Sequence, residues 1–444
     1  MGAGNAAARQ AAQDRGGERH GARGGAVAQG FREVTSSISA AVDGKRLARD
    51  IEAIAAFSEQ DPATGCSRPT FSPAWRKARD YVMREAQAAG CVTRVDAAGN
   101  VHARPAALGW EAPAWLCGSH VDSVPTGGRF DGVVGVVTAL EVLRAAPQSA
   151  MELIVFAEEE GTTFNLGMLG SKAWVGTLGP GELGSLRNAE GRDYLSAGAD
   201  HGVDPARLAS ERFSAASYRG LVEVHIEQGP SLWKSGEPLA VVTGINGRRQ
   251  YWCTLSGAAN HAGSTKMADR LDALAGAAQA MVFLESLGKE LDQEMDHTVI
   301  TVGRIEAHPN ALNVIPGRAR FSVDFRSPSD AVLNRGEKRL RAQLLQIAAA
   351  RGLQIEIACT EQVPAVPMDS GMCEMLRAAG RRLDLRLPDA VSGALHDTAI
   401  LAPALPAAML FVASRDGISH NPAEFSRIEH IALAARVLVE AFSA

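Results

Sequence analysis

Two apolar runs with a helical segment between them constrain the fold of this chain most. "PAWLCGSH" (113–120) ends at His120, and "MELIVFAEEEG" (151–161) ends in three glutamates. The segment between them, "GVVGVVTALEVLRAA" (132–146), has the length and composition of a buried helix. The order buried strand, helix, buried strand predicts a parallel α/β core. Ligands of such sheets collect at the carboxyl ends of the strands, where His120 and the glutamates stand.

The spacing of apolar residues changes near residue 240 and changes again near residue 362. Here the apolar spacing predicts the order β-α-β-β-α-β, which is the ferredoxin-like pattern. We therefore expect a catalytic domain made of residues 31–239 and 363–444, with residues 240–362 inserted as a second domain. The expected strands are 247–259, 297–309, 319–327 and 353–363, and the expected helices are 271–288 and 331–352.

Composition narrows the class of protein. The 444 residues are 46% apolar and 21% charged, which is typical of a globular protein of two or three domains. The net charge of −5 and the lack of a basic stripe argue against a nucleic-acid partner. No apolar run approaches the roughly 20 residues of a membrane span. Scattered cysteines without a CxxC pair predict reduced thiols in the cytoplasm, and the Gly/Ala/Arg-rich residues 1–30 are predicted to be a disordered tail.

Four segments of the chain, called stations below, carry side chains that could together bind metal at one site. Imidazole and carboxylate together are typical ligands of zinc, manganese, cobalt or nickel. A single histidine more often has no role in metal binding or catalysis. A run of glutamates is usually a solvated helix face, but this run directly follows the apolar segment "LIVFA". The stations are His120 with Asp131, Glu158 with Glu159, His225 in "VEVHIEQGP", and His420 in "GISHNPAEF".

The segment "GSHVDSVPTGGRFDG" (118–132) brings one of these carboxylates back to its histidine. Glycines at 127, 128 and 132 allow a tight turn that returns Asp131 towards His120. Asp131 has two oxygens and can bridge two ions about 3.5–4 Å apart, which activate a shared water and polarise a carbonyl. Asp122 is placed to accept the other ring N–H of His120 and so to orient the imidazole.

Taken together, eight motifs resemble the amidase/hydantoinase-carbamoylase branch of the M20 metallopeptidase superfamily. This branch contains N-carbamoyl-L-amino-acid hydrolases, β-ureidopropionases and allantoate amidohydrolases, and the resemblance covers roughly residues 35 to 444. It implies a mixed-sheet catalytic domain of the zinc-peptidase type with an inserted ferredoxin-like dimerisation domain. The motifs are "GSHVDSVPTGGRFDGVVGV", "FAEEEGTTFNLGMLGS", "EVHIEQGP", "NHAGSTKM", "NALNVIPG", "DFRS", "SGALHD" and "GISHNPAE".

The resemblance also implies a role for each matching residue. Two divalent ions would be bound, and Glu158 would be the general base for the attacking water and the leaving nitrogen. His261 and Asn313 would face the developing oxyanion or polar groups of the substrate, some of them across a homodimer. Arg326 would grip the substrate carboxylate, with Gln228 as a further substrate contact. The ligands implied are His120, Asp131 and His225 for one ion, and Asp131, Glu159 and His420 for the other.

Three positions depart from the pattern of the branch. Thr163 stands where Arg is usual, Lys266 where Pro is usual, and Leu395 where Gly is common. None is a predicted ligand, so these departures bear on the identity of the substrate and leave the prediction of hydrolysis intact.

The leading hypothesis is a two-metal amidohydrolase that cleaves the ureido C–N bond of an N-carbamoyl amino acid, releasing ammonia and carbon dioxide. Allantoate and carbamoyl-β-alanine are the alternative substrates within the branch. An M20 aminopeptidase or deacylase is a further alternative, against which His225 and "HIEQGP" argue. A metal-free scaffold protein is the remaining alternative, and the intact set of ligands argues against it.

Overall fold

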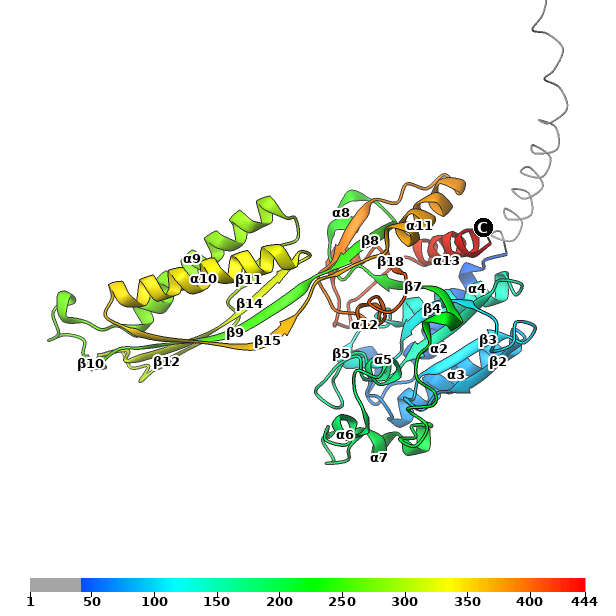
Figure 1. The fold of residues 1–444 in the computed structure, drawn as a ribbon, viewed down its shortest axis with the longest axis horizontal. Coiled ribbons are helices and arrows are strands. Elements are labelled where there is room, and N and C mark those ends of the chain that lie inside the picture. Colours follow the sequence, from blue (N-terminus) through cyan, green and yellow to red (C-terminus); the bar gives the residue numbers. More distant parts are fainter. Residues whose placement is uncertain (1–40, 444) are drawn as a thin grey trace, which may run out of the picture.

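The computed structural model describes residues 41–443, which form two lobes joined by extended chain (Figure 1). The first lobe is built on a nine-stranded sheet and the second on a five-stranded sheet. The predicted tail, residues 1–30, and the first residues of the predicted catalytic domain lie outside the described part. None of the helices in residues 41–443 is long and apolar enough to cross a membrane.

The sheet of the first lobe is parallel in its centre, and its flanking pairs are antiparallel except for β17 with β8, which is parallel. Its order is β16-β8-β18-β7-β4-β6-β3-β2, with β17 beside β8. The central strands β4, β6, β7 and β18 are parallel neighbours, as predicted for the two apolar runs. The mixed α/β sheet is therefore confirmed. The strands are β2 (Cys91–Val95), β3 (Val101–Pro105), β4 (Ala114–His120), β6 (Met151–Phe156), β7 (Tyr218–Ile226), β8 (Leu239–Ile245), β16 (Val366–Pro367), β17 (Asp389–Ser392) and β18 (Ala407–Val412).

Helices cover both faces of this sheet, because the central strands are apolar on both sides. Cys117 and Val222 point into a core shared with α2, α3, α4, α11 and α13. Leu116 and Leu221, one residue earlier on each strand, point into a second core with α5, α7 and α12. The helices are α2 (Gly44–Ala55), α3 (Pro73–Ala88), α4 (Val133–Ala145), α5 (Leu169–Val175), α6 (Pro180–Leu183), α7 (Tyr194–Gly198), α8 (Ser231–Ser235), α11 (Ser370–Arg382), α12 (Asp397–Leu401) and α13 (Ile428–Phe442), and a small sheet pairs β1 (Cys66–Arg68) with β5 (Ser123–Gly127).

The second lobe has the predicted β-α-β-β-α-β order. Its strands lie antiparallel in the order β11-β14-β9-β15, and β12 continues β11 along β14. Alternate residues of β9 and β14 are buried under α9 and α10, which leaves the opposite face of the sheet uncovered (Figure 1). The elements are β9 (Gly247–Ser256), β10 (Asn260–His261), α9 (Ala273–Glu294), β11 (Val299–Thr301), β12 (Ile305–His308), β13 (Val314–Ile315), β14 (Arg318–Ser327), α10 (Asp330–Ala350) and β15 (Gln354–Val363).

The boundary between the lobes differs from the expected position at residue 240. β8 pairs with β18 in the first lobe, so the chain crosses into the second lobe at Asn246 and returns between Val363 and Val366. β8 and β9 form one nearly continuous extended segment, with only Asn246 between them. The pair Asn246-Gly247 is typical of a turn, but the structure continues extended through it, so the sequence pattern did not locate the crossing.

Gly118 on β4 provides a test of how closely the central strands must approach. A Cβ atom there would lie 1.8 Å from the carbonyl oxygen of Ile154 on β6. We expect Gly118→Ala to lower the free energy of unfolding by about 1–3 kcal/mol or more in urea titrations. Gly181→Ala is the control, because nothing lies within 4 Å of the added atom, and its effect should stay within about 0.5 kcal/mol. Equal stability of the two variants would contradict the close strand approach.

Candidate metal centre

Two histidines stand side by side at the carboxyl edge of the parallel sheet. His120 is the last residue of β4 and His225 is the next-to-last residue of β7, which is the parallel neighbour of β4. Their rings are stacked with centroids 5.8 Å apart, and both side chains are buried. Residues 105 positions apart in the sequence therefore meet because their strands are neighbours and run in the same direction.

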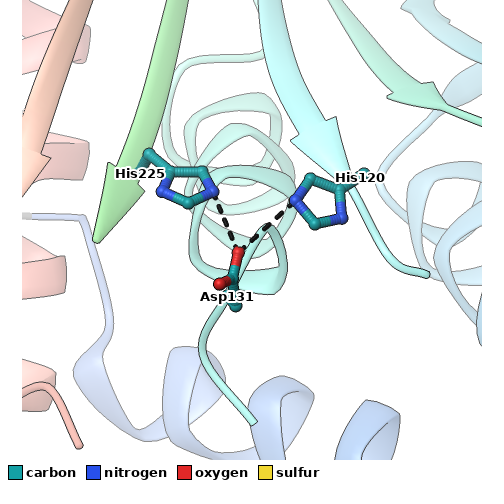
Figure 2. A group of neighbouring side chains, drawn as sticks. All are labelled: His120, Asp131 and His225. Carbon is teal, nitrogen blue, oxygen red and sulfur yellow. Dashed lines mark ion pairs between the residues drawn. The ribbon is translucent and has the colours of Figure 1, made fainter. Parts of the chain in front are cut away.

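Asp131 reaches this pair from the glycine-rich turn before α4 (Figure 2). One carboxylate oxygen, Oδ1, lies 3.1 Å from Nε2 of His225 and 3.5 Å from Nε2 of His120. Gly132 follows with a φ of 65°, and a Cβ atom there would lie 2.5 Å from the ring of His120. Only glycine combines that backbone conformation with that closeness, so Gly132 is what lets Asp131 face the histidines.

The hydrogen bonds of the two rings show that a cation fits between them. Nδ1 of His120 lies 3.0 Å from the carbonyl oxygen of Asp122, and Nδ1 of His225 lies 3.0 Å from that of Ile226. A carbonyl only accepts, so each Nδ1 carries a proton and each neutral ring turns the lone pair of Nε2 towards Asp131. Both Nε2 atoms are buried without a hydrogen-bond partner. Two lone pairs facing a carboxylate oxygen are stable only with a proton or a metal ion among them.

A second group of ligand atoms shares Asp131. Nε2 of His420 lies 3.3 Å from Oδ2 of Asp131 and 3.5 Å from Oε2 of Glu160. The ligand atoms of each group, His120–Asp131–His225 and Asp131–Glu160–His420, lie within 4.8 Å of one another. Asp131 thus offers Oδ1 to the first group and Oδ2 to the second. The side chain of His420 is 48% exposed, so the second group is open to solvent.

In the run of three glutamates, the side chain that lies with Asp131 and His420 is one residue later than the sequence predicted. Glu160, and not Glu159, is the residue grouped with Asp131 and His420. Glu159 points to the first group, with Oε2 3.7 Å from Nε2 of His120. Glu158 is not brought to either group, because its Oε1 accepts the backbone N–H groups of Thr163 and Phe164 at 2.8 and 2.9 Å. Three identical residues in a row carry no signal of register, whereas the positive φ of 55° at Glu158 redirects the chain.

The crowding of buried carboxyl groups raises the pKa values of Glu159 and Glu160. Burial raises the pKa of Glu160 to about 7, with the carboxylate of Asp131 adding to the shift. Burial likewise raises the pKa of Glu159 well above its ordinary value, with Glu160 contributing. The contact with Asp131 raises the pKa of His420 to about 9. So many acids in one buried place need positive charge, which protons or divalent cations supply.

Three side chains around Asp131 hold its carboxylate and its backbone. Nε2 of Gln228 donates to Oδ2 of Asp131 at 2.8 Å, and the hydroxyl of Ser419 lies 2.9 Å from the same oxygen. Glu424 accepts the backbone N–H groups of Phe130 and Asp131 at 2.7 and 3.0 Å. Gln228, predicted as a substrate contact, thus contacts Asp131. Sequence reasoning missed Ser419 and Glu424, whose only signal is that they lie in the same motif as His420, one residue before it and four residues after it.

Asp122 orients the site by a different atom from the one predicted. The backbone carbonyl of Asp122, and not its carboxylate, is closest to Nδ1 of His120, since Oδ1 lies 3.7 Å away. Its carboxylate instead accepts the backbone N–H of Glu160 at 3.1 Å. Asp122 therefore holds a ligand from each group, one through its main chain and one through its side chain.

The residues predicted on the inserted domain are not at this cluster. His261 is exposed on β10 at the far end of the second lobe, and the carbonyl of Asn313 accepts the N–H of Ala262 beside it (Figure 1). Arg326 lies at the junction of the lobes, where its Nε contacts Asp324 at 2.8 Å and its Nη1 contacts the carbonyl of Gly393 at 2.8 Å. Within one chain, the structure brings the predicted metal ligands together but keeps His261 and Asn313 apart from them.

Comparison with known proteins places this cluster in a family. The family described as Peptidase family M20/M25/M40 matches residues 116–444, which include every residue of both ligand groups. The chain belongs to the M20/M25/M40 peptidase family. The resemblance seen in the motifs is therefore confirmed.

Relatives within the M20 family point to its amidohydrolases. An N-carbamoyl-L-amino acid amidohydrolase of Geobacillus stearothermophilus is 35% identical over 89% of this chain and 97% of its own length. An allantoate amidohydrolase of Escherichia coli (strain K12) is 33% identical over 85% of this chain and 92% of its own. A solved amidase of the hydantoinase/carbamoylase family from Burkholderia multivorans is 35% identical, covers 90% and 97%, and superposes with a TM-score of 0.80. The prediction of an amidohydrolase is confirmed.

Metal content tests the shared role of Asp131. Asp131→Asn keeps the shape of the side chain but removes the charge that faces both groups. We expect the affinity for divalent metal to fall at least about 100-fold, beyond the 10–100-fold typical of losing a hydrogen-bonding partner of a ligand. Metal analysis after dialysis against a weak chelator measures this. Asp389→Asn, an exposed aspartate paired with Arg377, is the control, and full metal retention in Asp131→Asn would contradict the bridge.

Proposed function

We propose that this protein hydrolyses the carbamoyl (ureido) group of an N-carbamoyl amino acid, releasing ammonia and carbon dioxide. The observation that carries the proposal is the pair of ligand groups joined by Asp131, with Glu159 beside them. An N-carbamoyl-L-amino acid amidohydrolase among the relatives supports this substrate class. Allantoate is the second candidate substrate, because an allantoate amidohydrolase is nearly as similar.

The residues present fit two divalent ions, which we propose as zinc, manganese, cobalt or nickel. His120, Asp131 and His225 would hold one ion, and Asp131, Glu160 and His420 the other. Such ions polarise a carbonyl and make bound water a nucleophile at neutral pH. A ureido carbon needs both effects, because two nitrogens donate electrons into its carbonyl.

Glu159 is our proposed general base, in place of Glu158. Its side chain is 10% exposed and lies beside the first ligand group without belonging to either group. Its carboxylate accepts a proton from the attacking water as the new C–O bond forms, and passes that proton to the leaving nitrogen as the C–N bond breaks. Ammonia leaves, and the carbamate that remains decomposes to the free amino acid and carbon dioxide.

Homodimer formation through the second lobe is proposed from the position of His261. His261 and Asn313 are exposed at the end of the second lobe far from the metal cluster (Figure 1). Two large apolar side chains are exposed near them, Met267 at 78% and Leu312 fully. If His261 and Asn313 contact substrate, as the M20 motifs imply, they reach the metal centre of a partner subunit. Arg326, at the lobe junction, is proposed to bind the substrate carboxylate.

The cytoplasm is the compartment we propose. All six cysteines lie in the described part of the chain, and none of them forms a disulfide. Five of the six are buried. Free thiols in this number are typical of a reducing compartment.

Three glutamine substitutions test the function and the register of the glutamates together. We expect Glu159→Gln to retain metal and lose turnover about 10²–10⁴-fold, as for a lost general base. Glu160→Gln should lose metal from the second group. Glu158→Gln should retain metal and most activity, since an amide oxygen also accepts the N–H groups of Thr163 and Phe164. Ammonia release from a panel of N-carbamoyl amino acids and allantoate, with metal analysis, measures these effects.

Two outcomes of that experiment would overturn parts of the proposal. Loss of turnover in Glu158→Gln together with metal loss in Glu159→Gln would restore the assignment predicted from the sequence. Release of amino acids from peptides, without ammonia from any ureido acid, would indicate a peptidase of the M20 family instead.

Complementation between two inactive variants tests the partner-subunit role of His261. His261→Ala and Glu159→Gln each damage a different part of the same site. If His261 serves the partner's metal centre, mixed dimers contain one complete site, so activity returns when the two proteins are unfolded together and refolded. His430→Ala, a histidine of α13 that belongs to neither ligand group, is the matched control and should be active alone. Absence of any recovery, in protein shown to be dimeric by sedimentation, would contradict the crossed site.

A further inference from the structure

A cavity lies between the uncovered face of the second-lobe sheet and the first lobe. Its volume is about 770 Å³, and its walls include Gln250, Trp252, Ser322 and Arg326 of the second lobe. It meets the first lobe at Gly393, three residues before His396. The ring of His396 lies 4.4 Å from that of His225, so the loop that closes the cavity also contacts the metal centre.

A bulge in the sheet presents Arg304 to this cavity. β11 and β12 both pair with β14, Thr301 opposite Asp324 and Ile305 opposite Phe321. Four steps along one strand therefore face three steps along the other, which leaves one extra residue. Ser322 fixes the bulge on both sides, accepting the N–H of Arg304 on its hydroxyl and donating its own N–H to the carbonyl of Arg304, each at 3.1 Å. Bulges of this kind redirect a side chain, often beside an active site.

Arg304 is the arginine of the cavity wall that has no ion-pair partner in residues 41–443. Arg326 is already paired, since its Nε and Nη2 contact the two carboxylate oxygens of Asp324 at 2.8 and 3.2 Å. The ion pairs in residues 41–443 include none with Arg304, although Arg304 lines the same cavity. The wall also contains Asp324 itself and His297, whose Nε2 lies 3.7 Å from the carboxylate of Asp296. The other polar groups of the wall are amide and hydroxyl groups such as Gln250 and Thr301. The cavity thus carries a free guanidinium, which suits an anionic group.

We propose that Arg304 binds a second acidic group of the substrate, so that the preferred substrates are N-carbamoyl derivatives of dicarboxylic amino acids. This inference rests on the proposed function and names the substrate class of the same site. Arg326 and Ser322 are four residues apart on one face of β14, roughly 13 Å along the strand. Arg304 lies beside Ser322, and both arginines line the cavity, so two carboxylates of one small molecule can be held together. An uncharged side chain leaves Arg304 without a partner.

The test compares N-carbamoyl-L-glutamate with its neutral isostere, N-carbamoyl-L-glutamine. For the wild-type protein we expect a higher kcat/KM with the glutamate derivative. Arg304→Gln should lower kcat/KM for that substrate about 10- to 100-fold, the size of one lost charge-assisted hydrogen bond, and lower it far less for the glutamine derivative. Arg318→Gln is the matched control. Arg318 is exposed on β14, as Arg304 is exposed beside it, but it does not line the cavity.

Three outcomes would overturn the inference while leaving the proposed hydrolysis standing. They are equal kcat/KM values of the wild type for the two derivatives, equal losses for both in Arg304→Gln, and an equal loss in Arg318→Gln. If no ureido acid is hydrolysed at all, the proposed function fails. Calorimetric titration of N-carbamoyl-L-glutamate into the wild type and Arg304→Gln then decides the subsite, because binding that is weakened only in Arg304→Gln supports it and unchanged or absent binding overturns it.

Discussion

The carboxylate of Asp131 is the constraint on which the rest of this structure depends. It is buried, and its two oxygens face three imidazole nitrogens, two of which have no other partner. A buried charge in that position is costly unless cations share it. The surrounding hydrogen bonds from Gln228 and Ser419, and the grip of Glu424 on the backbone, keep the carboxylate in place. The fold therefore places a buried carboxylate, which requires a neighbouring positive charge, at the edge of the sheet where the parallel strands end.

The division into two lobes places the ligand groups in the first lobe and most of the cavity wall in the second. The first lobe supplies ligands and a candidate base from strand ends and the loops after them, which the core on both faces of the sheet makes rigid. The second lobe covers one face of its sheet with helices and leaves the other face to line the cavity. Arg326 and the loop at Gly393 connect the two regions, since that loop continues to His396 beside His225. A change in the angle between the lobes would therefore reach both the cavity and the metal centre.

Much of this architecture follows from local pattern. The apolar runs ending at His120 and Phe156 formed neighbouring parallel strands, and the β-α-β-β-α-β order of the second lobe appeared as expected. Both depend on spacing of apolar residues, which a sequence displays directly. The crossing at Asn246 was not predicted, because one extended segment belongs to two sheets, and the chain stays extended through Asn246-Gly247 although this pair is typical of turns. The grouping of Glu160, and not Glu159, with Asp131 and His420 was not predicted, because three identical neighbours differ only in the backbone angles that direct their side chains.

By itself, the sequence determined the types of ligand and the strand ends that carry them, because residue chemistry and apolar periodicity are local properties. It also showed a glycine at 132 that permits a tight turn, whereas the requirement for glycine there, set by the positive φ and by the nearby ring of His120, is tertiary. Only the tertiary structure decided which glutamate joins which group, that Gln228 and Glu424 serve Asp131, and that Arg304 is left unpaired in the cavity. These depend on where a side chain points and on what already occupies its partners, and such information exists only once distant segments are packed together.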